Sequence, residues 1–273
     1  MRYADLHLHT YHSDGTRSPR EVIDLARERG LDIVAISDHD QLAGYFEVKR
    51  YAEERGILLI PAVELSCMVD GADVHVLAYA FDAVDEQLNE RLRRFRETRQ
   101  ARGHRIVERL RALGYEVSAQ RVDELAAGGA MGRPHVARAL VERGYVASVS
   151  EAFDKLLGTG KPAYIDKERF RIDEAIALIR ATGGVTSIAH PTLYRNHDEI
   201  VPKLLDAGID AVEIYHPQVN EEWRERYANV ARFRGKFVTG GSDDHGTVKE
   251  CETLGTVKVP ETLIGPILER MSS

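Results

Sequence analysis

Two histidines near the start of the chain alternate with leucines. In the segment Asp5-Leu6-His7-Leu8-His9, residues two apart would share one face of a β-strand, so His7 and His9 would point the same way. Such a pair suits a metal ion, because histidine is the commonest metal ligand in proteins. A pair of exposed histidines on an edge strand is the alternative, and the motif alone leaves both interpretations open.

Other histidines and carboxylates stand in or just after short apolar runs. The runs cover residues 31–36, 57–63, 74–79, 184–189 and 236–240, and the polar residues are His39, Glu64, His75, His190, Asp243 and His245. Near-continuous apolar runs of this length are typical of buried strands in a parallel sheet. In a parallel barrel the carboxyl ends of all strands share one mouth, where active sites lie. We therefore expect these side chains to converge there.

A buried cluster of imidazoles and carboxylates implies bound cations. Aspartate, glutamate and histidine are rarely fully buried unless they are paired or bound to metal, because burying their charge is costly. The set contains no thiolate, which suits Mn²⁺, Fe²⁺ or Zn²⁺ rather than Ca²⁺ or Cu⁺. The donors exceed what one ion needs, so two or three metals are implied, with Glu64 as the natural bridge. Clustered metals promote phosphoester hydrolysis.

Amphipathic segments between the apolar runs predict helices that would hold these strands in place. Ser18-Pro19-Arg20-Glu21 has the pattern of a capping box with proline at the first helical position. Further helices are predicted at 44–55, 172–182 and 198–207, each followed by glycine. With Leu6–Leu8 and 209–214 there are about seven strand candidates. This number suits an α/β barrel of seven or eight strands.

The middle of the chain has a different pattern. Residues 99–166 contain no strand-like run, and short helices are predicted at 101–113, 119–127, 134–143 and 149–157. We therefore predict a barrel domain made of residues 1–98 and 167–273, with 99–166 as a helical insertion that forms a substrate lid.

The long helical segment at 86–113 carries five arginines on one stripe. They are Arg91, Arg94, Arg102, Arg105 and Arg109. The stripe is either a track for RNA phosphates or a solvated flank beside the apolar face of the helix, along which long arginine stems often lie.

Composition excludes several classes of protein. The chain has 273 residues, of which 43% are hydrophobic, and this argues against disorder. It lacks a membrane-spanning apolar run and a signal-peptide start, so no membrane partner is expected. Its two cysteines form no CxxC pair, which argues against a disulfide scaffold and predicts a reducing cytoplasm. A net charge of −7 argues against a broad basic surface for long nucleic acids, although a local basic pocket is allowed.

In their order along the chain, these motifs resemble the polymerase-and-histidinol-phosphatase (PHP) family of metal phosphoesterases. The matching segments are Asp5–Thr10 with Ser13-Asp14-Gly15, Ser37-Asp38-His39, Glu64, His75, His190-Pro191 and Asp243-Asp244-His245. The resemblance implies an α/β fold, a distorted (β/α)₇ TIM-like barrel with a helical insertion domain. It also implies a site for three metals, with Mn²⁺ expected and Zn²⁺ or Fe²⁺ as alternatives.

The resemblance implies a set of ligands for each metal. It gives His7, His9, Glu64 and Asp243 to the first, Glu64, His75 and His190 to the second, and Asp14, His39 and His245 to the third. Asp5 and Asp38 are expected to orient imidazoles. His12, two residues from Asp14, is expected to lie near the site or contact substrate.

The insertion and the segment Gly132-Arg133-Pro134-His135 are similar to a subgroup of the family that dephosphorylates 3′,5′-nucleotide bisphosphates. The resemblance implies removal of the 3′-phosphate, as in conversion of adenosine 3′,5′-bisphosphate to AMP, by attack of a metal-bridging hydroxide. Glu64, His190 and Asp243 would act at the reaction centre.

The second phosphate of such a substrate needs cationic partners. Arginine binds phosphate through two parallel hydrogen bonds, and helix N-termini favour anions. The candidates are Arg17, Arg133, His135 and Arg195, and each could instead be a surface residue.

Other functions remain open at this point. The same subgroup includes proteins that trim short RNA from the 5′ end, so a 5′–3′ exonuclease on short RNA or DNA is the main alternative. A histidinol phosphate phosphatase and a non-catalytic metal-binding module are weaker alternatives. The sequence does not predict the oligomeric state.

Overall fold

The computed structural model describes residues 1–126, 131–166, 168–248 and 252–271. The strands are β1 Tyr3–Leu8, β2 Ile33–Ile36, β3 Leu58–Val69, β4 Ala72–Tyr79, β5 Phe170–Arg171, β6 Val185–Ile188, β7 Ala211–Tyr215, β8 Phe237–Gly240 and β9 Val259–Pro260. The α-helices are α1 Pro19–Glu28, α2 Ala43–Glu54, α3 Glu86–Ala112, α4 Ala119–Leu125, α5 Arg133–Glu142, α6 Val149–Ala152, α7 Ile172–Ala181, α8 His197–Asp206, α9 Glu221–Phe233 and α10 Gly265–Met271. Short helical turns are η1 Phe153–Leu157, η2 Pro191–Leu193, η3 Gly246–Val248 and η4 Glu261–Leu263.

The strands form one sheet that curls into a nearly closed barrel. Their order is β8-β7-β6-β4-β3-β2-β1-β9, and β5 pairs with β3. An isolated bridge between Leu8 and Asp244 joins β1 to the loop that follows β8. All seven predicted strand segments form strands, which confirms the barrel class. The two-residue strands β5 and β9 were not predicted, because they are too short to leave an apolar pattern.

Two strands contradict the expectation of a purely parallel sheet. The two-residue strand β9 runs antiparallel to β1, and β4 runs antiparallel to both β3 and β6. For β4 the reason is local: β3 continues to Val69, well past the predicted end at residue 63, and Asp70-Gly71 then turns the chain back. Both turn residues have positive φ (50° and 80°), as tight hairpin turns require. His75 is thereby paired with Ser66, two residues beyond Glu64.

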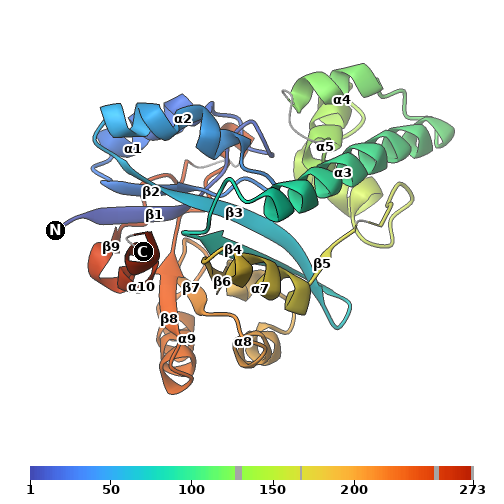
Figure 1. Ribbon diagram of the computed structural model, residues 1–273. Coiled ribbons are helices and arrows are strands. Elements are labelled where there is room, and N and C mark those ends of the chain that lie inside the picture. Colours follow the sequence, from blue (N-terminus) through green and yellow to red (C-terminus); the bar gives the residue numbers. More distant parts are fainter. Residues whose placement is uncertain (127–130, 167, 249–251, 272–273) are drawn as a thin grey trace.

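Helices cover the sheet from outside. The helices α1 and α2 lie over β1, β2 and β3 on one side, and α7, α8 and α9 lie on the other (Figure 1). Ser18 and Glu21 form the predicted capping box at the start of α1. The apolar faces of these helices bury residues such as Val22, Ile23 and Val201 in one continuous core with the strands.

A second core lies in the lobe formed by α3, α4, α5 and α6 (Figure 1). Leu88, Leu92 and Phe95, from the first half of α3, belong to the barrel core. Ile106 and Leu110, from its second half, pack instead with residues of α4, α5 and η1. The domain boundary that we predict at residue 98 therefore falls inside a continuous helix, and residue 167 lies outside the described residues. Those boundaries stay a prediction.

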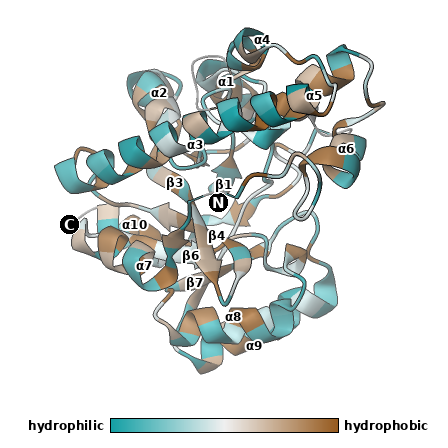
Figure 2. Ribbon diagram, turned by 90° about the vertical axis from the view of Figure 1, so that its right-hand side faces the viewer, coloured by the Kyte–Doolittle hydropathy of each residue, from teal (hydrophilic) through white to brown (hydrophobic). Residues whose placement is uncertain are grey.

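Helix α3 shows hydrophilic and hydrophobic residues along its whole length (Figure 2). Within the described residues, no helix is both long enough and apolar enough to cross a membrane.

Candidate metal centre

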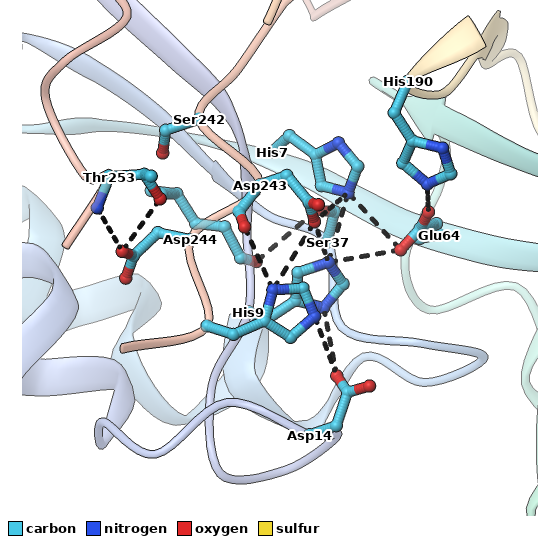
Figure 3. Close-up of polar contacts among 12 residues, drawn as sticks. His7, His9, Asp14, Ser37, Glu64, His190, Ser242, Asp243, Asp244 and Thr253 are labelled. Atoms are coloured by element: carbon cyan, nitrogen blue, oxygen red, sulfur yellow. Dashed lines mark hydrogen bonds and ion pairs between the residues drawn. The ribbon is translucent and has the colours of Figure 1, made fainter. Parts of the chain in front are cut away.

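The predicted ligands come from separate elements and meet at the barrel mouth, and six of them are labelled in Figure 3. His7 lies in β1, Glu64 in β3 and His75 in β4, whereas the others lie in the loops that follow β1, β2, β6 and β8. Except for His190, their donor atoms form three groups, within each of which all atoms lie within 4.8 Å of one another. The groups are His9, Asp14, His39 and His245; His7, His9 and Asp243; and His39, Glu64 and His75.

Glu64 lies at the centre of the cluster. Its Oε1 lies 2.9 Å from His75 Nδ1 and 3.1 Å from His190 Nε2. Its Oε2 lies 3.1 Å from His39 Nδ1 and 3.2 Å from His9 Nε2. The two oxygens therefore face different sets of histidines, which is the arrangement that a bridging carboxylate needs.

Two aspartates complete the cluster on its other side. Asp243 Oδ1 lies 3.3 Å from His9 Nε2 and 3.4 Å from His7 Nε2. Asp14 Oδ1 lies 3.3 Å from His245 Nε2. His9 lies beside both aspartates, and it belongs to two of the three donor groups.

Backbone geometry holds the ligands in place at some cost. His190 and Asp243 have positive φ (28° and 49°), which is strained for residues other than glycine. Strain of this kind costs about 1–3 kcal/mol per residue and is concentrated at functional sites. Gly241 is required for a different reason, because a Cβ there would lie 2.3 Å from the Cβ of His7.

The buried carboxylate that orients His7 is one that the sequence did not single out. Glu213, in β7, contacts His7 Nδ1 at 3.0 Å and accepts a 2.6 Å hydrogen bond from the backbone N–H of His190. A contact of this kind fixes the orientation of an imidazole and leaves its other nitrogen for a metal. The available signal was a glutamate inside the apolar run 209–214.

The expectation that Asp5 and Asp38 orient imidazoles is wrong for the contacts observed. Asp5 accepts hydrogen bonds from the backbone N–H groups of His7 and Ser242, and so links β1 to the loop that follows β8. Asp38 accepts hydrogen bonds from the backbone N–H of Thr10 and the hydroxyl of Ser13. Its link to an imidazole is indirect, because Ser13 Oγ in turn lies 3.3 Å from His9 Nδ1. Backbone N–H groups and hydroxyls, rather than ring nitrogens, therefore donate the hydrogen bonds that hold these two carboxylates.

The electrostatics of the cluster fit cations. Burial raises the pKa of Glu64 and of Asp243, but the surrounding histidines outweigh burial and hold both pKa values well below the usual range. Burial lowers the pKa of His9, but Asp243 and Glu64 outweigh it and raise this pKa to about 10. His7 Nε2 and His9 Nε2 lie only 3.1 Å apart. Crowded nitrogen and oxygen donors of this kind fit Mn²⁺, Fe²⁺ or Zn²⁺.

A pocket opens between the cluster and the helical lobe. Three predicted ligands line it, namely Asp14, His39 and His75. Its other lining residues are Asp40, Ser66, Phe95, Thr98, Arg99, Arg102, Arg133, Pro134, Phe153 and Glu168. One end of the pocket is therefore acidic and histidine-rich, whereas the other carries three arginines.

The predicted substrate residues lie in three different places. Arg133 lines the pocket, donates to the carbonyl of Leu157 and lies over the ring of Phe153. His135 is buried beneath it and accepts a hydrogen bond from Gly132 through Nδ1. Burial lowers the pKa of His135 to about 4, so its ring is neutral at pH 7.

Arg17 and Arg195 lie outside this pocket's lining. Arg17 forms ion pairs with Asp244 and Glu252, which occupy both ends of its guanidinium. Arg195 lines a separate hollow beside the β3–β4 turn, with Asp70 and Arg169. The phosphate role of Arg17 and Arg195 stays a prediction.

Two further histidines differ in how close they lie to the cluster. His12 pairs with Glu47 at 2.7 Å. His216 is buried, and its Nε2 lies 3.8 Å from Asp243 Oδ2. His216 follows β7 directly, and its place just after a predicted strand was a signal that could have flagged it.

Comparison with known proteins agrees with this geometry. The model of the PHP domain family matches residues 5–236. The chain belongs to the PHP domain family. Together with the cluster of histidines and carboxylates, the family identifies the protein as a metal-dependent phosphoesterase.

Three similar proteins span nearly the whole chain. A 5′-3′ exoribonuclease of Haemophilus influenzae is 34% identical over 88% of this chain and 89% of its own. A 3′,5′-nucleoside bisphosphate phosphatase of Chromobacterium violaceum is 30% identical over 100% of this chain and 98% of its own. The crystal structure of a candidate metal-dependent phosphoesterase from Bifidobacterium adolescentis superposes with a TM-score of 0.90 at 33% identity, covering 98% of this chain and 96% of that one.

Proposed function

We propose that this phosphoesterase removes the 3′-phosphate from 3′,5′-nucleotide bisphosphates, such as adenosine 3′,5′-bisphosphate, and leaves the 5′-monophosphate. The observation that carries the proposal is the two-ended pocket, in which predicted metal ligands and arginines line the same space. A substrate with two phosphates matches this arrangement, because each end can bind one of them. A relative named as a 3′,5′-nucleoside bisphosphate phosphatase supports it.

The residues that would hold the metals are the predicted ones, with three Mn²⁺ per chain as the proposed complement. His7, His9, Glu64 and Asp243 would bind the first ion, Glu64, His75 and His190 the second, and Asp14, His39 and His245 the third. Clustered divalent cations supply a hydroxide nucleophile at neutral pH and neutralise the oxygens of the reacting phosphate.

The protein's own residues then position the reaction. Glu213 holds His7, and it also fixes the backbone of His190 through a hydrogen bond. Asp14, His39 and His75 form the floor on which the reacting phosphate would lie. Burial of most of the cluster lowers the local dielectric constant, which strengthens electrostatic interactions at the reacting phosphate.

The test is a comparison of substrates with the purified protein supplied with Mn²⁺. We expect release of phosphate from adenosine 3′,5′-bisphosphate with AMP as the nucleotide product, and no phosphate release from histidinol phosphate. A product that retains the 3′-phosphate, or no turnover of bisphosphates at all, would contradict the proposal.

A second candidate is a 5′–3′ exonuclease on short RNA. It is favoured by a relative of that name and by the same basic pocket. The two activities are distinguished by chain length. Short 5′-phosphorylated oligoribonucleotides should be shortened stepwise to mononucleotides only if the second candidate holds, and gel analysis of the products would reveal this.

A further inference from the structure

Arg102, in the middle of α3, is a buried arginine that pairs with no carboxylate of the described residues. The residue is only 7% exposed, so more than nine-tenths of it is buried. Its Nε donates to the carbonyl of Ile165 at 2.7 Å, but its Nη2 is buried and has no hydrogen-bond partner among the described residues. A buried charge is costly unless it is paired, so its retention here calls for an anionic partner from outside the chain.

Two further arginines line the same pocket. Arg99 comes no closer than 3.8 Å to Asp40, and Arg133 donates to a backbone carbonyl. Burial is the main cause that lowers the pKa of Arg102 to about 10, and repulsion from Arg133 and Arg99 adds to it. The pocket thus gathers three guanidinium groups that repel one another.

The carboxylates at this end of the pocket already have partners within the protein. Asp40 accepts hydrogen bonds from the backbone N–H and the hydroxyl of Ser66. Glu168 pairs with Arg91 at 3.4 Å. Within the described part of the chain, neither of them forms an ion pair with Arg102, and the ion pairs that they do form are with Arg99 and Arg91.

The other arginines of the α3 stripe have different surroundings. Arg91 pairs with Glu174, Arg94 pairs with Glu90, and Arg109 donates to the carbonyl of Pro162. Arg105 is exposed. The stripe is thus neither a uniform solvated flank nor a continuous row of available cations, and only Arg102 faces the pocket that reaches the metal cluster.

We propose that Arg102, flanked by Arg99 and Arg133, is a specificity-determining residue that binds the phosphate group which is not hydrolysed. A planar guanidinium suits this role, because it can donate two parallel hydrogen bonds to one phosphate. A pocket with one such site takes a single terminal phosphate. This inference rests on the proposed function, since it assigns the second phosphate of that substrate to Arg102.

The first test measures binding without catalysis. Adenosine 3′,5′-bisphosphate is titrated calorimetrically into the metal-free full-length protein, as the wild type and as the variants Arg102→Gln and Arg105→Gln. Hydrogen bonds to charged groups contribute about 1.5–3 kcal/mol, so we expect Arg102→Gln to weaken binding about 10- to 100-fold. Arg105→Gln, which removes the same charge from the exposed face of the same helix, should bind within about twofold of the wild type.

The second test measures selectivity with the Mn²⁺-loaded enzyme. The ratio of kcat/KM for adenosine 3′,5′-bisphosphate to that for adenosine 3′-monophosphate should fall about 10- to 100-fold in Arg102→Gln. This ratio should stay at the wild-type value in Arg105→Gln. Equal losses on both substrates would mean that Arg102 has only a structural role, and would overturn the proposal.

The two proposals can fail separately. If the wild type does not hydrolyse bisphosphates, but Arg102→Gln still weakens their binding, the proposed function is wrong and the anion site stands. Wild-type affinity in Arg102→Gln would overturn the anion site, whatever the activity. Should Arg102→Gln fail to fold, Arg99→Gln and Arg102→Lys test the same site, with a smaller loss expected for each.

Discussion

The two ends of the pocket are built in opposite ways. At the barrel mouth, donor atoms of carboxylates and imidazoles lie within 4.8 Å of one another in each group, and several strands and the loops after them deliver these side chains. At the helical lobe, arginines project from α3 and α5, and Arg102 has no ion-pair partner among the residues that the structure describes. The mouth is thus an internally matched set of donors that needs cations, whereas the lobe is a set of cations that needs an anion.

This difference suggests how chemistry and selectivity are divided. The mouth is anchored to the barrel by Glu213 and by strained loops, so its geometry is fixed by the main core. The lobe has an apolar core of its own. Changes at the mouth should therefore affect turnover of every substrate, whereas changes at the lobe should affect substrates according to their second phosphate.

Removal of metal should have the largest effect. Treatment with a chelator should abolish phosphate release, and excess Mn²⁺ should restore it. Loss of a ligand present at about 100 times its Kd removes about 2.7 kcal/mol of stability, which lowers Tm by about 5–10 °C for a chain of this size. Differential scanning calorimetry and hydrogen exchange measure this, and increased exchange confined to α4 and α5 would contradict the placement of the metals at the mouth.

Glu64→Gln should reduce turnover nearly as much. The amide cannot bridge two cations as a carboxylate does, and loss of several kcal/mol corresponds to about a 1,000-fold lower kcat. Phosphate release and metal content by mass spectrometry measure the effect, with the exposed Glu28→Gln as control. A variant with full activity and full metal content would refute the central position of Glu64.

Glu213→Gln should have an intermediate effect. Partners that orient metal-binding histidines typically contribute 10- to 100-fold to metal affinity or activity, so activity should require about that much more Mn²⁺. A Mn²⁺ titration of activity measures this, and Glu222→Gln, on the exposed start of α9, serves as the control. Identical Mn²⁺ curves for Glu213→Gln and wild type would show that Glu213 is merely structural.

Arg133→Ala should have the smallest effect of the four and the most selective one. Arg133 lies at the lobe end of the pocket, so its loss should raise KM for adenosine 3′,5′-bisphosphate about 10-fold and change kcat little. Steady-state kinetics give both constants. A fall in kcat with an unchanged KM would place Arg133 at the reacting phosphate and break the division between the two ends.

Local sequence patterns were sufficient to locate the seven longer strands and to single out most of the candidate ligands. The apolar runs, the capping box at Ser18 and the glycines after helices each depend on neighbours a few residues away, so they can be read without the fold. Most ligand positions follow for the same reason, since polar residues at the ends of parallel strands reach the mouth together, whereas His75 reaches it from the antiparallel strand β4.

Only the tertiary structure decided which distant groups meet. Glu213 rather than Asp5 reached the imidazole of His7, and Arg17 was held by Asp244 and Glu252. Arg102 and Arg105 are both arginines on the same helix, yet one is buried in the pocket and the other is exposed. Spacing fixes the side of a helix or strand on which a residue lies, but the packing of other elements against that side determines its partners, and these elements lie far away in the sequence.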